Sequence, residues 1–160
     1  GVEFAAVLGI LYDLAVDAVA DSGGSVNNLI GDSVMAVFNA PVALPDHPWR
    51  AAEAGARFLG MLATYRRDHP DEAFDVHIAV ETGPALVGDV GPEERYIFTV
   101  TGACVPLASR LTKLPIHNRV VVGPGTAEAL AGRVTFTPYG PVEIRGIDGA
   151  EYVYLMGEDG

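Results

Sequence analysis

The apolar pattern near the start of the chain predicts an amphipathic helix. From Phe4 to Ala18, apolar side chains recur at spacings of three and four residues, which places them along one stripe of a helix. The Gly23-Gly24 pair follows this stripe, at a position where glycine commonly ends a helix. Because Asp13 and Asp17 interrupt the apolar stretch, it predicts neither a signal peptide nor a membrane span.

The next pattern predicts a β-hairpin. Two short apolar runs, Val26 to Ile30 and Val34 to Phe38, flank the sequence Gly31-Asp32-Ser33. Turn residues between two β-type runs are typical of a hairpin with a tight turn. We therefore expect Asp32 at the hairpin tip.

Helices and strands then alternate along the rest of the chain. A second helix is expected from Trp49 to Arg67, with Asp46 as N-cap and Pro70 beyond its end. The other expected elements are strands from Phe74 to Thr82, Ala85 to Val90, Tyr96 to Val100, Val120 to Val122, Val134 to Thr137, Val142 to Arg145 and Tyr152 to Met156, a turn at Gly91-Pro92, and helices from Cys104 to Lys113 and Gly125 to Leu130. This order predicts one domain over residues 1–160, an α/β sandwich with helices on a mixed sheet.

Composition and charge narrow the classes of function. The 160 residues, 49% of them hydrophobic, are enough for one buried core. A formal net charge of -11 produces a field that repels phosphate backbones and anionic lipids, so we expect no nucleic-acid partner and no direct membrane contact. Cys104 is the single cysteine, which indicates a reducing, cytoplasmic compartment. His47, His69, His77 and Cys104 show no metal-ligand spacing.

Six segments carry the informative motifs. They are Gly23 to Phe38, Ile78 to Gly83, Val87 to Gly91, Tyr96 to Gly102, Val105 to Leu111 and Val142 to Gly146. In order and in nearly gapless spacing, they resemble the catalytic domain of class III adenylate and guanylate cyclases over almost the whole chain. The resemblance implies an α+β, ferredoxin-like βαββαβ core with a mixed or antiparallel sheet. It also implies active sites at the interface of a homodimer or a heterodimer, a nucleoside triphosphate such as ATP as ligand, and Mg²⁺ or Mn²⁺ as cofactor.

The resemblance assigns roles to several residues. Asp32 matches a metal-binding aspartate, and Arg110 matches an arginine that stabilises the transition state. Thr99 matches a base-selecting position at which threonine is typical of adenylate cyclases, Asn28 stands where the family has an adenine-reading lysine, and Arg145 replaces a phosphate-binding lysine. From the residues alone, Asp32 is equally a turn aspartate, Thr99 an ordinary strand threonine and Arg145 a solvated strand-end arginine.

The departures from the family pattern bear on activity. Pro106 replaces an asparagine that donates to the phosphate one helical turn before Arg110. Removing one preorganised donor lowers the rate about a hundred- to a thousandfold, and we expect the missing N–H of proline to shift the helix start. Glu81 stands where histidine is usual, and Ala103 where aspartate is common. The strand that brings the other metal-binding aspartate should precede the first helix, so we expect the domain to be truncated at its N-terminus or completed by a strand from elsewhere.

Three functions follow from these patterns. The first is a catalytically impaired cyclase domain that serves dimerisation or nucleotide sensing in cyclic-nucleotide signalling. The second is an active purine cyclase that converts ATP to cyclic AMP and pyrophosphate, either with unusual residues or in a heterodimer whose partner supplies the missing lysine and asparagine. Adenylate cyclase is favoured over guanylate cyclase. The third is a ferredoxin-like binding module without nucleotide, such as an RNA-binding domain, although the basic and aromatic strand face that RNA requires is absent from the sequence.

Overall fold

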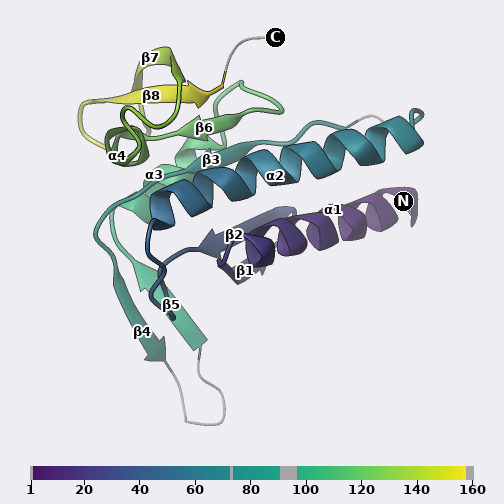
Figure 1. Ribbon diagram of the computed structural model, residues 1–160, viewed down its shortest axis with the longest axis horizontal. Helices are drawn as coiled ribbons and strands as arrows, with labels where there is room; N and C mark the ends of the chain where they lie inside the picture. Colours follow the sequence, from purple (N-terminus) through teal and green to yellow (C-terminus); the bar gives the residue numbers. More distant parts are fainter. Residues whose placement is uncertain (1, 73, 91–96, 158–160) are drawn as a thin grey trace. The chain divides into compact units, whose positions relative to one another are not determined.

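The computed structural model describes residues 2–72, 74–90 and 97–157 (Figure 1). The chain divides into two compact units, Gly1–Phe74 and Asp75–Gly160. The first contains α1 (Val2–Asp21), β1 (Ser25–Ile30), β2 (Ser33–Val37) and α2 (His47–Asp68). The second contains β3 (Ile78–Val80), β4 (Leu86–Val90), β5 (Ile97–Thr101), α3 (Cys104–Leu111), β6 (Val120–Val122), α4 (Pro124–Ala129), β7 (Phe136–Glu143) and β8 (Ala150–Met156). Helices combined with mixed and antiparallel sheets confirm the predicted α+β class.

α1 ends at the predicted glycine pair. Gly23 adopts φ +86°, a left-handed conformation that glycine reaches without a Cβ clash. The Gly24 N–H donates to the Val19 carbonyl at 2.9 Å, and the Gly23 N–H donates to the Ala20 carbonyl at 3.1 Å. These two bonds form a Schellman motif, which satisfies carbonyls that the helix end leaves open.

β1 and β2 form the predicted antiparallel hairpin. Ile30 pairs with Ser33, so Gly31 and Asp32 make a two-residue turn, and Gly31 has the positive φ of +57° that such a turn favours. The pairing shifts between Val26 and Asn28, which makes the residue between them the extra residue of a β-bulge. The hairpin places Asp32 at its tip, as expected.

α2 begins earlier than predicted, at His47 rather than Trp49. Asp46 does occupy the N-cap position, but its φ of 64° is left-handed and its side chain makes no capping hydrogen bond. The expectation that this carboxylate caps the helix is therefore wrong. Pro48, in the first turn of α2, fits there because the N–H groups of that turn have no acceptor within the helix.

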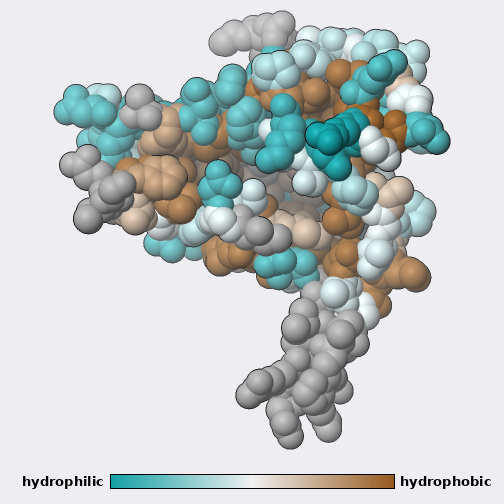
Figure 2. Space-filling model, turned by 180° about the vertical axis from the view of Figure 1, so that it is seen from behind, coloured by the Kyte–Doolittle hydropathy of each residue, from teal (hydrophilic) through white to brown (hydrophobic). Residues whose placement is uncertain are grey.

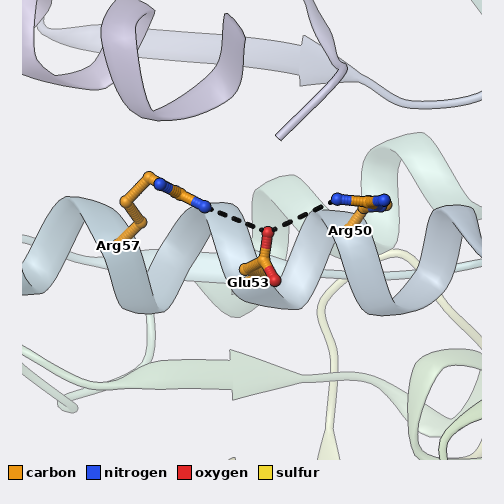
Figure 3. Close-up of polar contacts among 3 residues, drawn as sticks. All are labelled: Arg50, Glu53 and Arg57. Carbon is orange, nitrogen blue, oxygen red and sulfur yellow. Dashed lines mark hydrogen bonds and ion pairs between the residues drawn. The ribbon is translucent and has the colours of Figure 1, made fainter. Parts of the chain in front are cut away.

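The solvent face of α2 carries a small ion-pair cluster (Figure 3). Glu53 Oε1 lies 3.2 Å from Arg57 Nη2 and 3.8 Å from Arg50 Nη1. Pairs of this kind, with both side chains in contact with water, contribute about 0–1 kcal/mol. The opposite face of the helix is buried at Ala52 and Leu62. Burial of this face therefore contributes more to the stability of α2 than the ion pairs do.

The second unit contains two sheets. One is four-stranded in the order β3-β6-β8-β7, with β3 and β6 parallel and the other pairs antiparallel. The other is the antiparallel β4-β5 hairpin. α3 buries Leu107 and Leu111 in the core of this unit. The core cluster consists of Leu107, Leu111, Ile116, Val121, Ile144, Val153 and Leu155.

Two strand predictions need correction. The strand expected from Phe74 to Thr82 is paired only at Ile78–Val80, because its partner β6 has three residues. The strands expected at Val134 to Thr137 and Val142 to Arg145 are one continuous strand, β7. β7 tolerates its prolines because it lies at the sheet edge and has a bulge between Pro138 and Gly140, positions where a missing N–H is not needed. The predicted Gly91-Pro92 turn lies outside the described residues.

Apolar side chains also reach the surface. Leu86 and Val87, on β4, are 80% and 45% exposed, and Figure 2 shows hydrophobic residues interspersed with hydrophilic ones over the face it presents. Among the described residues, no helix has both the length and the apolar composition needed to cross a membrane.

Candidate functional site

The hairpin of the first unit carries two of the predicted site residues. Asp32 lies in the turn between β1 and β2, and Asn28 lies on β1 directly after the bulge. Both side chains are exposed. Asn28 pairs across the hairpin with Met35. Water or a ligand therefore has access to the carboxylate and to the amide.

Thr99 lies on β5, directly opposite Gly88 on β4. Its hydroxyl donates a hydrogen bond of 2.9 Å to the Gly88 carbonyl, and the residue is exposed. A hydroxyl has one hydrogen and two acceptor lone pairs. In this arrangement the hydrogen is engaged by Gly88, and the hydroxyl presents its acceptor lone pairs to a ligand.

α3 presents Pro106 and Arg110 on its exposed side. The helix begins at Cys104, as predicted, so Pro106 does not shift its start. Pro106 stands in the first turn, where N–H groups lack an acceptor within the helix and proline is tolerated. One turn later comes Arg110, while Leu107 and Leu111 fill the core. Pro106 thus offers no side-chain donor one turn before Arg110, and the helix is intact around it.

The second unit brings Arg110 close to the segment that carries Arg145. A Cβ built on Gly146 would lie 3.8 Å from Arg110 Nη2, and Arg145 directly precedes this glycine. Both arginines are exposed. Within the described residues, neither guanidinium makes a hydrogen bond or an ion pair. Two cations are therefore available for an anionic ligand near this corner of the unit.

Acidic neighbours moderate the charge near Arg145. An open surface depression of about 480 Å³ is lined by residues of the β7–β8 connection: Glu143, Ile144, Arg145, Ile147, Asp148 and Gly149. Two carboxylates and one guanidinium give this depression a net negative charge. Arg145 alone therefore does not make this depression cationic.

Glu81 has a structural role that sequence reasoning missed. Its Oε1 accepts hydrogen bonds from the Thr82 N–H at 2.9 Å and from the Thr126 N–H at 3.1 Å. Thr126 is the third residue of α4, so this carboxylate caps the helix and interacts favourably with its dipole. A Cβ on Gly123 would come within 2.6 Å of the carboxylate. The glycines flanking Pro124 were the sequence signal for this close approach.

Cys104, the first residue of α3, is half-buried near the same carboxylate. Burial raises the pKa of its thiol above the ordinary value, and the negative charge of Glu81 adds to this rise. The thiol remains protonated at neutral pH and is therefore a poor nucleophile.

The described residues match a divalent-metal site only in part. They contain no group of three or more His, Cys, Asp or Glu residues that could hold a metal ion. Asp32 supplies a single carboxylate. Mg²⁺ commonly takes one or two protein carboxylates together with water and substrate phosphates, so Asp32 suits one such ion but not the two-metal arrangement that the family resemblance implies.

The fold is that of nucleotide cyclases. The chain matches the crystal structure of the adenylyl cyclase CyaB from P. aeruginosa with a TM-score of 0.86 and 18% identity, over 99% of this chain and 84% of that chain. It matches the guanylate cyclase domain of RhGC from Catenaria anguillulae, solved in complex with GTP, with a TM-score of 0.82 and 23% identity, over 94% and 81% of the two chains.

The sequence relationship defines the family. Residues 13–157 match the model of the adenylate and guanylate cyclase catalytic domain, and the chain belongs to this family. It is 32% identical over 157 residues to Adenylate cyclase 1 of Rhizobium meliloti (strain 1021), which covers 95% of this chain and 24% of that relative. The chain thus spans about a quarter of the length of this relative. The resemblance inferred from the motifs is confirmed, and the domain is one of cyclic-nucleotide signalling.

Proposed function

We propose that this domain is a cyclase domain with impaired turnover, which serves cyclic-nucleotide signalling by dimerising with another cyclase domain and sensing a nucleoside triphosphate. The observation that carries the proposal is Pro106. It occupies the exposed side of α3 one turn before Arg110, where a side-chain donor to the phosphate would be needed. Proline supplies none.

The size of the expected loss in reaction rate supports impaired turnover. One missing donor in a preorganised site lowers the rate by about 10² to 10³, which corresponds to about 2.7–4 kcal/mol of transition-state stabilisation. Asn28 adds a second loss, because its amide is neutral where a lysine would carry a charge. Asp32 offers one carboxylate for metal binding, with Mg²⁺ or Mn²⁺ as the proposed ion.

Nucleotide binding is supported by the groups that remain. Among residues 2–72, 74–90 and 97–157, no hydrogen bond or ion pair engages the guanidinium groups of Arg110 and Arg145, and arginine forks match phosphate oxygens well. With its hydrogen bonded to Gly88, Thr99 presents an acceptor. The exocyclic N6 group of adenine is a donor that suits such an acceptor. This match supports ATP as the proposed ligand.

Exposed apolar residues support dimerisation, and the cysteine content supports a cytoplasmic location. The exposed apolar side chains of Leu86 and Val87 on β4 suit a protein interface better than water. The partner is a second copy or a different cyclase domain. A cytoplasmic location is supported by the single cysteine, Cys104, because disulfides are rare in that compartment.

A matched pair of variants tests the proposal. The purified 160-residue chain is incubated with ATP or GTP and with Mg²⁺ or Mn²⁺. The cyclic AMP or cyclic GMP that forms is then measured. We expect no substantial product from the natural sequence. Pro106→Asn should raise any residual rate by about a hundredfold, and Pro106→Asn combined with Arg110→Ala should abolish the gain. Robust turnover by the natural sequence, with no other subunit present, would refute impairment.

Nucleotide sensing is measured separately from turnover. With excess ATP and Mg²⁺, a bound ligand raises the melting temperature in proportion to the logarithm of its concentration. We expect this rise for ATP, a smaller rise for GTP, and its loss in the double variant Arg110→Ala, Arg145→Ala. If ATP gives no stabilisation, dimerisation alone remains as the proposed role.

The free arginines also support a second candidate function, an active adenylate cyclase in a heterodimer. In this case the partner supplies the asparagine and lysine that the present chain lacks. The test mixes the chain with a cyclase domain that has its own arginine removed. Cyclic AMP production by the mixture, dependent on Arg110 of the present chain, would support this function over impairment.

A further inference from the structure

Two histidines meet in the second unit, away from the residues considered so far. His77 lies directly before β3, and His117 lies in the segment that leads into β6. Their ring centroids are 4.6 Å apart, with an angle of 54° between the ring planes. Both residues are exposed. Within the described part of the chain, neither imidazole makes a hydrogen bond, so the ring nitrogens are open to a ligand.

The backbone beneath the two rings is held in place by hydrogen bonds. Asn118 donates from its N–H to the Val76 carbonyl at 2.9 Å, and its Oδ1 accepts from the Val76 N–H at 3.2 Å. The Nδ2 group of Asn118 donates to Asp75 Oδ1 at 2.9 Å. These three bonds join the residues next to each histidine. The two imidazoles are therefore brought together before any ligand binds, which reduces the entropy lost on binding.

The chemistry of the pair selects one class of metal ion. Imidazole nitrogens favour zinc, nickel and copper, whereas carboxylate and carbonyl oxygens favour magnesium and manganese. The formal net charge of -11 attracts cations in general. Because the rings are exposed, each can turn about its side-chain bonds to direct one nitrogen towards a shared ion.

We infer that His77 and His117 form a two-histidine site for a divalent ion of the zinc, nickel and copper class. Two protein ligands leave the other coordination positions to water, since no third ligand completes the group among the described residues. The ion joins the segment entering β3 to the segment entering β6, two strands that pair in parallel from Ile78 and Val120. Binding therefore stabilises the sheet of the second unit.

The site differs in chemistry from any metal position at Asp32. An exposed carboxylate in a turn favours Mg²⁺ or Mn²⁺, and a histidine pair favours the softer ions. The two kinds of site can therefore be distinguished by the metal used. The inference also does not depend on whether the domain turns over nucleotide.

The experiment titrates ZnCl₂, NiCl₂ and MgCl₂ separately into the purified chain, with heat release as the measurement. We expect one saturable event with Zn²⁺ and with Ni²⁺. His77→Ala and His117→Ala should each weaken it by roughly tenfold or more, because even groups that only support a ligand change metal affinity by about 10- to 100-fold. His77→Gln and His117→Gln repeat the test with polar side chains of similar length, and circular dichroism confirms folding.

Two control variants separate this site from other ligands of the chain. His47→Ala and His69→Ala remove the remaining histidines and should leave Zn²⁺ affinity unchanged, as should Asp32→Asn. The inference is overturned if the natural chain does not bind Zn²⁺ or Ni²⁺, or if the double variant His77→Ala, His117→Ala binds them as tightly as the natural chain.

Discussion

Removal of the Glu81 carboxylate should destabilise the second unit measurably. In Glu81→Ala, the Thr82 and Thr126 N–H groups lose the acceptor that lies 2.9 and 3.1 Å away. Loss of a helix cap destabilises a protein by about 0.5–2 kcal/mol. A hydrogen bond to a charged group adds about 1.5–3 kcal/mol when buried. Glu81 is half-buried, so water replaces part of the loss, and we expect a total of about 1–3 kcal/mol.

Two further variants show where this stability comes from. Glu81→Gln keeps an acceptor oxygen and loses the charge that interacts with the α4 dipole, so we expect a smaller loss, about 0.5–1 kcal/mol. Glu53→Ala removes a carboxylate, 27% exposed, that pairs with two exposed arginines on α2, and should change stability by less than about 1 kcal/mol. The expected order of destabilisation is Glu81→Ala, then Glu81→Gln, then Glu53→Ala.

Thermal unfolding followed by circular dichroism gives this order. For a chain of this size, 1 kcal/mol corresponds to about 2–4 °C in Tm, so 2 kcal/mol for Glu81→Ala corresponds to about 4–8 °C. Amide hydrogen exchange provides a local readout, because the Thr126 amide should exchange faster in Glu81→Ala. The reasoning is wrong if Glu81→Ala is no less stable than Glu53→Ala, or if exchange at Thr126 does not change.

Four smaller predictions concern packing and titration. Gly125→Ala should destabilise by at least about 1–3 kcal/mol in urea unfolding, because a Cβ there overlaps the Thr82 carbonyl oxygen. Leu111→Ala, at a core position 1% exposed, should lose about 2–5 kcal/mol in the same assay. The pKa of the Cys104 thiol is raised in the folded state, so this group stabilises the folded state below the ordinary thiol pKa, and the contribution disappears as pH rises through the folded pKa. Because the thiolate is the reactive form, alkylation by iodoacetamide at pH 8 should be slower for the folded chain than for the unfolded chain. The pKa of Tyr65 is raised chiefly by its hydrogen bond with Glu72, so in Glu72→Gln this tyrosine should ionise at lower pH when absorbance at 295 nm is followed.

Local patterns predicted the elements whose limits depend on nearby residues. The hairpin with Asp32 at its tip follows from the glycine between two apolar runs, and Val120 to Val122 forms the predicted strand. Where the limits of a strand depend on its pairing partner, the local apolar pattern predicted them incorrectly. Of the apolar run from Phe74 to Thr82, only the residues opposite β6 are paired. The prolines in β7 predict a break, but the edge position of this strand removes the need for their N–H groups.

The candidate site was predictable in part for a similar reason. The motifs identified Asp32 and Arg110 by their place in the chain, and their roles in binding remain predictions. The sequence could not show that Arg110 lies beside Gly146, because that contact joins a helix to a distant loop. The glycines flanking Pro124 indicated a close approach at the start of α4, but not that the approaching group is the Glu81 carboxylate, and no pattern indicated that His77 and His117 meet. Each of these contacts is created by the sheet that joins segments far apart in sequence.

Pro106 changes the polar groups that α3 presents without changing the helix itself. Because it stands in the first turn, a single codon can exchange a donor for a proline while the helix register and the hydrophobic anchors stay the same. A change at this one residue is therefore expected to alter the polar groups that α3 presents while the packing of the helix stays the same. The residue four positions before the helix arginine is thus the place to examine when related chains are sorted into those that retain the donor and those that have lost it.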